Sequence, residues 1–187
     1  VPAIAAPVPS MVIMFGSYAI AHFVAPKMVF GEQKVAGFVV GSVFQGIAMG
    51  YLLLAAILVG QVVNGNPFGL ILTALGLTGL TSAGMVAYVW SNPKEFKMLG
   101  AMLSALFIPM MVLMVLSFVF PIGGTLGLLL TGVFVVVSAA GLLYQINAVM
   151  HQLRTDQHVE GSYMITMGVL ILFWNLLSLL IQLTNID

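Results

Sequence analysis

The sequence predicts an all-α membrane protein with a single polytopic transmembrane domain over residues 1–187. Its residues are 61% hydrophobic and 5% charged, whereas a soluble domain carries about 25% charged residues. It also contains six long apolar runs, and about 20 helical residues are enough to cross the hydrocarbon core of a bilayer. Strands of a membrane barrel are excluded, because those are segments of about ten residues with alternating polarity.

The six apolar runs define six expected membrane helices joined by short turns. The second run is longer than a bilayer is thick, so we expect this helix to tilt or to project into water. Uncharged turns are expected where Asn-Gly-Asn-Pro and Pro-Ile-Gly-Gly interrupt the apolar sequence. The expected helices cover residues 9–25, 35–63, 68–90, 98–120, 125–150 and 162–184.

The distribution of basic residues predicts how these helices are oriented. Every Lys and Arg lies in one of three loops, 26–35, 91–97 and 151–161, which alternate with uncharged turns. Because cytoplasmic loops are enriched in Lys and Arg, we expect these loops in the cytoplasm and both Val1 and Asp187 on the outer side. A start on the outer side implies a cleaved signal peptide or one further helix upstream.

Composition and spacing argue against several classes of function. The net charge is zero and cysteine is absent, which excludes nucleic acid as a partner and rules out thiolate metal sites. No Asp, Glu, Lys or Arg falls inside an expected span, so a buried carboxylate relay for protons is not expected. No nucleophile triad, phosphate loop or haem arrangement is present. The sequence therefore predicts no enzymatic activity, no cofactor and no metal site.

The candidate functional residues are amides at membrane depth. On the last two helices they recur with small residues at spacings of three and four, so each helix presents a weakly polar stripe to the other. Such a stripe either lines a path for a small solute or hydrated cation, or holds helices together by hydrogen bonds. We favour the second interpretation, because amides in lipid must find partners whatever the function. The candidate polar stripe comprises Gln45, Gln145, Asn147, Asn175 and Gln182.

Small residues and one proline predict features of helix packing. The pairs Gly37/Gly41 and Gly46/Gly50 on the second helix have the spacing that allows two helices to approach closely. Pro109 lies in the middle of the fourth helix, where a missing backbone N–H is expected to produce a kink. That kink is either a gate or a feature of shape.

Polar and aromatic residues near the helix ends are expected at the membrane surface. His22 is expected to reach the interface from the end of the first helix. Glu160 is expected in a solvated loop, together with His151, Asp156 and His158. Aromatic residues near span ends are interpreted as interfacial anchors; these are Tyr18, Tyr51, Tyr88, Trp90 and Tyr163.

Four segments resemble one known family. Residues 138–151 (SAAGLLYQINAVMH) and 170–180 (LILFWNLLSLL) are similar to the end of the Bax inhibitor-1 family, in particular its bacterial YccA-like branch. Residues 91–103 (SNPKEFKMLGAML) fit its loop before the fifth helix, and 44–51 (FQGIAMGY) its Gly-rich third helix. The resemblance implies a bundle of seven helices with a cytoplasmic N-terminus, of which this chain lacks or has lost the first.

The resemblance also implies where a functional centre would lie. Family members that act as pH-sensitive calcium leak channels carry two facing aspartates on their last two helices. These positions fall on Gln145 and Leu172, and the accompanying arginine has no counterpart, since Arg154 lies in a loop. Without carboxylates the site has neither a hard ligand for calcium nor a titrating group.

We therefore expect a non-enzymatic, multi-pass protein of a bacterial inner (plasma) membrane that acts through protein–protein contacts. The YccA-like branch is associated with the FtsH membrane protease as substrate and modulator, which implies a similar partner here. Two alternatives remain. One is a passive channel of the calcium-leak type that has lost its acidic pair and is lined by amides. The other is a small accessory subunit of a larger membrane complex.

Overall fold

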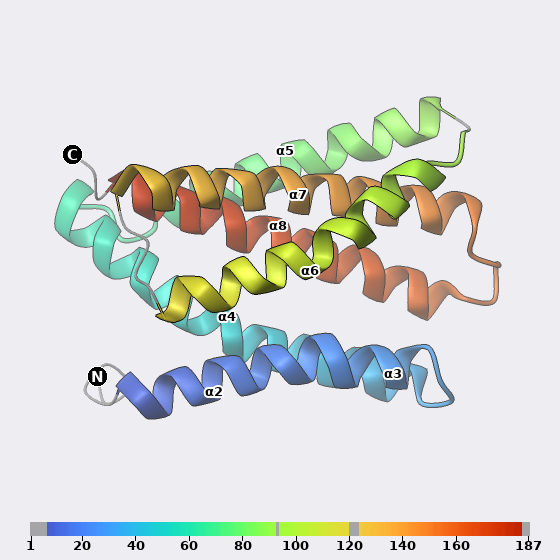
Figure 1. The fold of residues 1–187 in the computed structure, drawn as a ribbon, viewed down its shortest axis with the longest axis horizontal. Coiled ribbons are helices and arrows are strands. Elements are labelled where there is room, and N and C mark those ends of the chain that lie inside the picture. Colours follow the sequence, from blue (N-terminus) through green and yellow to red (C-terminus); the bar gives the residue numbers. More distant parts are fainter. Residues whose placement is uncertain (1–6, 93, 120–123, 185–187) are drawn as a thin grey trace.

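The chain forms a bundle of long helices joined by short loops (Figure 1). The computed structural model describes residues 7–92, 94–119 and 124–184, with their side chains except those of 7–11, 64, 107–108, 110–111 and 113–119. The elements are α2 (Pro7–Ala19), the π-helical turn η1 (Ile20–Val24), α3 (Ala25–Val29), α4 (Lys34–Asn64), α5 (Gly69–Ser91), α6 (Lys97–Val119), α7 (Gly124–His151) and α8 (His158–Thr184).

The predicted all-α membrane fold is confirmed. Within the described residues, five helices are long and apolar enough to cross a membrane, and α6 adds 23 helical residues. The first helix continues to Val29 instead of ending at residue 25, because Pro26 occupies the start of α3, where a missing N–H is tolerated. The last helix begins at His158 instead of residue 162, and Glu160 lies in its first turn. A negative charge in the first turn interacts favourably with the helix dipole.

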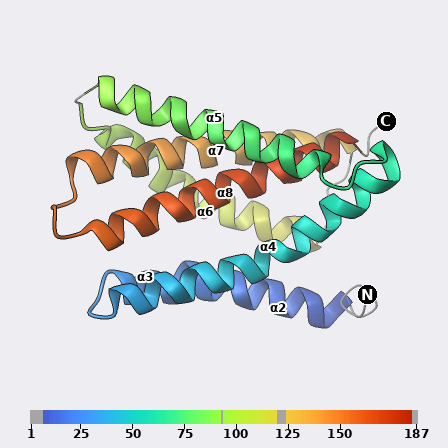
Figure 2. The same cartoon turned by 180° about the vertical axis from the view of Figure 1, so that it is seen from behind.

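Helix α8 is the centre of the bundle. It packs against α3, α4, α5 and α7, and it lies between α4 and α7 in views from both sides (Figures 1 and 2). By contrast, α6 packs only against α7 among the described residues. The buried residues of α8 recur around the helix instead of forming one stripe; they are Glu160, Gly161, Tyr163, Met167, Gly168, Leu172, Phe173 and Leu177.

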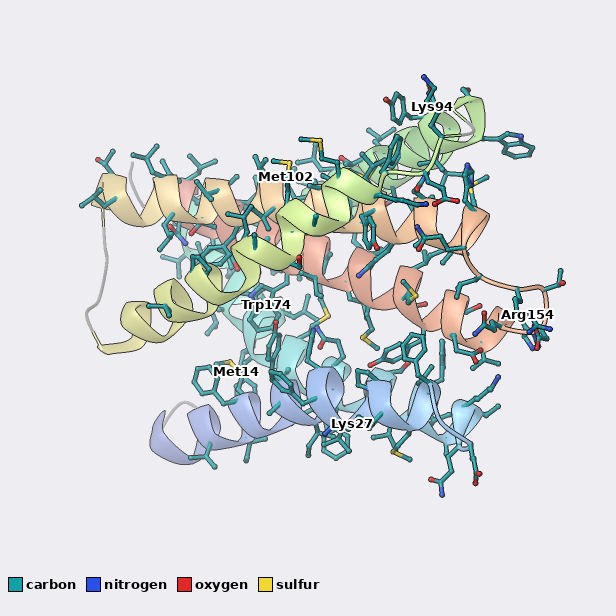
Figure 3. All side chains as sticks on the ribbon, turned by 45° about the vertical axis from the view of Figure 1, so that its right-hand side comes forward. Met14, Lys27, Lys94, Met102, Arg154 and Trp174 are labelled. Carbon is teal, nitrogen blue, oxygen red and sulfur yellow. The ribbon has the colours of Figure 1, made fainter. Side chains whose placement is uncertain are left out.

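The loops that carry the basic residues meet at one end of the bundle. The loops after α3, α5 and α7 lie together, while the α4–α5 turn and the start of α2 lie at the opposite end (Figure 1). Lys94 and Arg154 both lie toward the first end (Figure 3). The charge pattern predicts that these three loops lie on the same side of a membrane, and their common position at one end of the bundle agrees with it. Which membrane face this end occupies stays a prediction, and Val1 and Asp187 lie outside the described residues.

The uncharged turn between α4 and α5 depends on a glycine. Gly65 has a φ of 63°, and its N–H bonds to the carbonyl of Gly60. This left-handed conformation is the common end of a helix and favours glycine, which has no Cβ to clash. The turn signal in the sequence therefore ends α4 where it was expected.

The two glycine pairs of α4 lie in different surroundings. A Cβ added to Gly37 would lie 2.6 Å from the backbone nitrogen of Val29, and one added to Gly41 would lie 2.6 Å from the ring of Tyr163. Gly46 and Gly50 are exposed and have no such neighbour within 4 Å. The first pair thus lets α3 and α8 approach α4 closely. Pro109 lies inside α6, and the kink and the packing role of the second pair stay predictions.

We predict that Gly41→Ala lowers the free energy of unfolding by about 1–3 kcal/mol, since overpacking a tight contact forces backbone or ring to move. Thermal unfolding of the purified protein in detergent measures this. Gly46→Ala is the matched control on the same helix and should leave stability unchanged or slightly higher, because alanine favours helix. An equal loss at both positions would contradict the role of the Tyr163 contact.

Candidate functional site

In the seam where α7 meets α8, the side chain of Gln145 packs directly against Gly168. A Cβ on Gly168 would overlap Oε1 of Gln145 and would lie 3.0 Å from Leu142. The absence of a side chain at Gly168 therefore makes room for the Gln145 amide between the helices. Oε1 of Gln145 is buried and has no hydrogen-bond partner among the described residues.

A second amide joins the same two helices nearer their other ends. Nε2 of Gln182 on α8 donates to Oγ1 of Thr131 on α7 at 2.7 Å. A hydrogen bond between side chains of neighbouring membrane helices contributes about 0.6–2 kcal/mol to their association. This hydrogen bond links the two helices, so the Gln182 amide is not free to line a path for a solute.

Asn147 on α7 points toward a loop and not toward α8. It is fully buried, its Oδ1 accepts from the N–H of Phe96 at 3.0 Å, and its Nδ2 donates to the carbonyl of Lys94 at 2.9 Å. These two backbone groups lie in the loop before α6, and the Asn147 side chain gives each of them a hydrogen-bond partner. Asn147 fixes the α5–α6 loop onto the end of α7.

The remaining two amides of the polar stripe lie on different helices. Gln45 on α4 is 1% exposed, and neither its Nε2 nor its Oε1 has a hydrogen-bond partner among the described residues. Asn175 on α8 is partly buried. Two of the five candidate amides are thus hydrogen-bonded in place, and two have buried atoms without partners among the described residues. Whether the five form one stripe stays a prediction.

A hydrogen bond from Tyr163 holds the first helix against α8, and the sequence analysis missed it. In η1 the N–H of Ala25 bonds to the carbonyl of Ile20, and Pro26 has no N–H to offer the carbonyl of Ala21. The hydroxyl of Tyr163 donates to that carbonyl at 2.6 Å. Tyr163 is 4% exposed, so its interpretation as an interfacial anchor was wrong. The signal in the sequence was the proline five residues after Ala21.

Glu160 is the second correction. Expected in a solvated loop, it is instead 3% exposed within the first turn of α8, and its Oε1 pairs with Nζ of Lys34 at 2.6 Å. The pair ties the start of α4 to the start of α8. The hydropathy of the sequence did not predict this ion pair. Both residues lie at the polar ends of their helices, where charged side chains are ordinarily solvated by water.

His22 was also expected at the interface, and in the structure it is partly buried. Its ring stacks on Tyr18 with centroids 4.0 Å apart, and its Nδ1 lies 3.0 Å from the Tyr18 carbonyl. Its Nε2 is buried without a hydrogen-bond partner among the described residues. The interfacial position of His22 stays a prediction.

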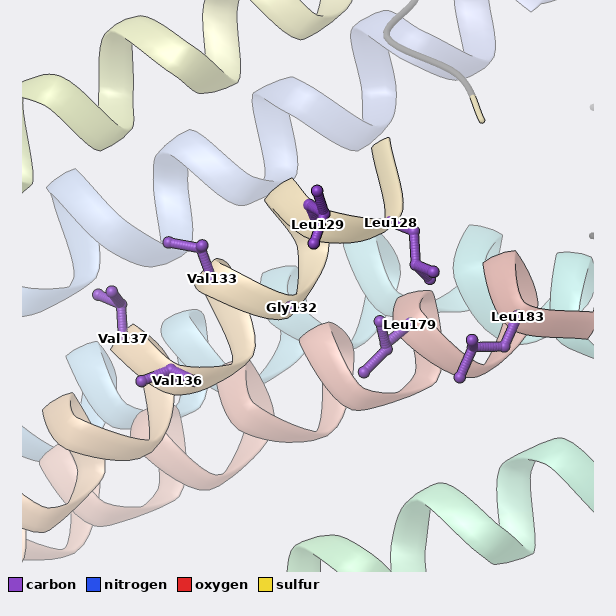
Figure 4. Close-up of a pocket in the computed structure, with 8 residues that line it drawn as sticks. All are labelled: Leu128, Leu129, Gly132, Val133, Val136, Val137, Leu179 and Leu183. Carbon is purple, nitrogen blue, oxygen red and sulfur yellow. The ribbon is translucent and has the colours of Figure 1, made fainter. Parts of the chain in front are cut away.

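An apolar groove runs along α7 and α8 (Figure 4). Hydrocarbon side chains have no means of orienting a polar substrate, which requires a few placed polar groups. The groove has the chemistry of a lipid-facing surface. Its lining residues are Leu128, Leu129, Gly132, Val133, Val136, Val137, Leu179 and Leu183. Elsewhere in the described part of the chain, no three His, Asp or Glu side chains gather to hold a metal ion.

Comparison with known proteins identifies the family. The family described as "Inhibitor of apoptosis-promoting Bax1" matches residues 1–185. The chain belongs to the Bax inhibitor-1 family. No curated protein and no solved structure matches it. The family predicted from the sequence is thereby confirmed, while its YccA-like branch stays a prediction.

The two positions expected for the Bax inhibitor-1 aspartates have neutral surroundings. Leu172 is 1% exposed and packs in one cluster with Val89, Leu142 and Ile146. Gln145 lies against Gly168, one turn before Leu172 on α8. A carboxylate at position 172 would meet hydrocarbon, and one at position 145 would lie against Gly168. In the described part of the seam, these two positions form packed contacts without a carboxylate.

We predict that Tyr163→Phe lowers the free energy of unfolding by about 1–3 kcal/mol, because the buried Ala21 carbonyl loses its donor. Thermal unfolding in detergent measures this, with the exposed Tyr88→Phe as control. In a Pro26→Ala background the restored N–H can serve the Ala21 carbonyl, so the same substitution should cost less. An undiminished loss in that background would contradict the account of η1.

We predict an asymmetry between the partners of the ion pair. Lys34→Met leaves the buried Glu160 carboxylate without a cation, whereas Glu160→Gln leaves a Lys34 ammonium that is 41% exposed and accessible to water. Lys34→Met should therefore lower the melting temperature more than Glu160→Gln. Asp156→Asn is the control, since its pair with Arg154 is exposed and such pairs contribute little. Equal losses for Lys34→Met and Glu160→Gln would show that the burial of the carboxylate is unimportant.

Proposed function

We propose that this Bax inhibitor-1 family protein acts through contacts with other membrane proteins, without catalysing a reaction, and modulates a membrane protease of the FtsH type. The observation that carries the proposal is the outer face of α6. Met98, Met102 and Leu106 recur at every fourth residue and are 78%, 53% and 41% exposed. Figure 3 shows Met102 on the outside of the bundle.

The attachment of α6 supports this role. Among the described residues it packs only against α7, and the side chains of Met98, Met102 and Leu106 are exposed. Methionine is unbranched and adapts to irregular surfaces, a property of interfaces that accept partners of varied shape. The loop before α6 is fixed by Asn147, which presents this surface in a defined orientation.

The closed seam argues against the passive calcium channel. Calcium takes six to eight oxygen ligands, mostly carboxylates and carbonyls, and the two expected acidic positions hold an amide and a buried leucine. Gln182 is bonded to Thr131, which leaves no row of free amides along α8. The accessory-subunit alternative shares the α6 surface with the favoured proposal and differs only in the partner.

We predict that the protein changes the rate at which a co-reconstituted FtsH-type protease degrades a membrane-protein substrate. The double substitution Met98→Ala, Met102→Ala should weaken this effect, because truncating a central interface side chain costs about 1 kcal/mol or more, roughly fivefold in affinity. Substrate loss from proteoliposomes, titrated with the protein, measures both.

The control is Leu126→Ala near the start of α7, a residue that is 70% exposed. It should leave the effect unchanged. An unaltered degradation rate, together with a fixed complex recovered in mild detergent, would replace the protease proposal with the accessory subunit. Calcium flux into liposomes that varies with pH would overturn the proposal in favour of a channel.

A further inference from the structure

Pro109 removes the helical donor of one backbone carbonyl in α6. The proline lies inside the helix and has no N–H, so the carbonyl of Ala105, four residues earlier, loses the hydrogen bond that a helix normally gives it. The neighbouring hydroxyl, that of Ser104, donates instead to the carbonyl of Ala101 at 2.8 Å. Among the described residues, no other side chain donates to Ala105. The proline therefore leaves a backbone acceptor that needs a donor from elsewhere.

This carbonyl belongs to the exposed face of α6. Ala105 and Pro109 are both exposed. They share a face with Met98, Met102 and Val112, because all five follow one another at spacings of three and four residues. Met98, Met102 and Val112 are 78%, 53% and 52% exposed. Such alternating spacings are those of a seam along which a second helix packs.

The depth of the carbonyl excludes lipid chains as the source of the donor. At about 1.5 Å per helical residue, Ala105 lies about 12 Å along α6 from Lys97, and half of a hydrocarbon core is about 15 Å. Lipid chains offer no hydrogen bonds at that depth. Membrane helices that contain a proline regain the lost bond from side chains or from a neighbouring helix. The neighbour of α6 among the described residues is α7, and it gives Ala105 no donor.

The same face of a second copy of this chain does not supply the donor. None of the side chains along the exposed seam has an N–H or O–H group. Two such seams packed against each other would leave both Ala105 carbonyls without a donor. The partner that fits is therefore a helix of different sequence, which brings a donor of its own. The seam comprises Met98, Met102, Ala105, Pro109 and Val112.

We propose that this face of α6 receives a membrane helix of another protein, whose hydroxyl or amide side chain at mid-membrane depth donates to the Ala105 carbonyl. Serine, threonine, asparagine and glutamine supply such donors, and hydrogen bonds of this kind link neighbouring membrane helices. The exposed methionines supply the adaptable apolar part of the contact. The inference rests on the proposed function, because it specifies the chemistry of the partner at the α6 surface.

Solid-state NMR of the protein in lipid bilayers tests whether the carbonyl is free. Alanine labelled with ¹³C at its carbonyl and leucine labelled with ¹⁵N select the Ala-Leu sequences of the chain, which are Ala74–Leu75 and Ala105–Leu106. A carbonyl carbon resonates at higher frequency when its oxygen accepts a hydrogen bond. Ala74 is the internal reference, because its carbonyl accepts from Oγ1 of Thr78 at 2.7 Å.

We expect the Ala105 carbonyl to resonate at lower frequency than that of Ala74. Pro109→Ala restores the N–H, so it should move the Ala105 signal toward the Ala74 signal and leave Ala74 unchanged. An Ala105 signal that already lies at the position of Ala74, and that does not move in Pro109→Ala, would overturn the proposal, because the carbonyl would then be paired within the chain.

A synthetic membrane helix tests the donor. The probe is a peptide of about 20 leucine and alanine residues with one central serine, and its control has alanine in place of the serine. We expect the serine peptide to raise the frequency of the Ala105 signal. It should also bind about threefold more tightly than its control, by energy transfer in bilayers. Pro109→Ala should abolish that preference. Equal binding of the two peptides to the unaltered protein would overturn the proposal.

These measurements contain no protease, so their failure is distinct from failure of the proposed function. Preference for the serine peptide together with an unchanged rate of proteolysis by an FtsH-type protease would leave the donor-bearing partner standing and remove the protease. Equal binding of the peptides together with a changed rate of proteolysis would remove the donor and leave the protease.

Discussion

Lipid supplies no hydrogen bonds, and this constraint explains most of the polar contacts between the helices. Pro26 leaves the carbonyl of Ala21 without a backbone donor, and Tyr163 of the central helix supplies one from a different part of the sequence. The first helix is thereby joined to α8 at the place where its own hydrogen bonding is interrupted. The tight approach of α4 at Gly41 encloses the same tyrosine ring.

The same constraint places the charges. The Lys34–Glu160 pair lies where α4 and α8 both begin, so the two helices are linked by charge at one end and by apolar packing beyond it. A buried ion pair is weak evidence for stability, because desolvation offsets much of the attraction. Its value here is positional: it sets the relative register of α4 and α8, on which the contacts of Gly41 and Tyr163 depend.

The described contact between α7 and α8 is built from neutral side chains. With Leu172 packed among Leu142 and Ile146, and Gln145 seated on Gly168, the described seam contains no group that titrates near neutral pH.

The sequence alone determined the fold class, the order of the helices and their ends to within a few residues, because the length of an apolar run and the position of a turn are local properties. Only the tertiary structure decided that Gln182 bonds to Thr131, that Asn147 holds a loop, and that Gln45 and Gln145 retain unpaired atoms. Partner choice depends on the rotation and register of each helix against its neighbours, and a shift of one residue turns a side chain by about 100°.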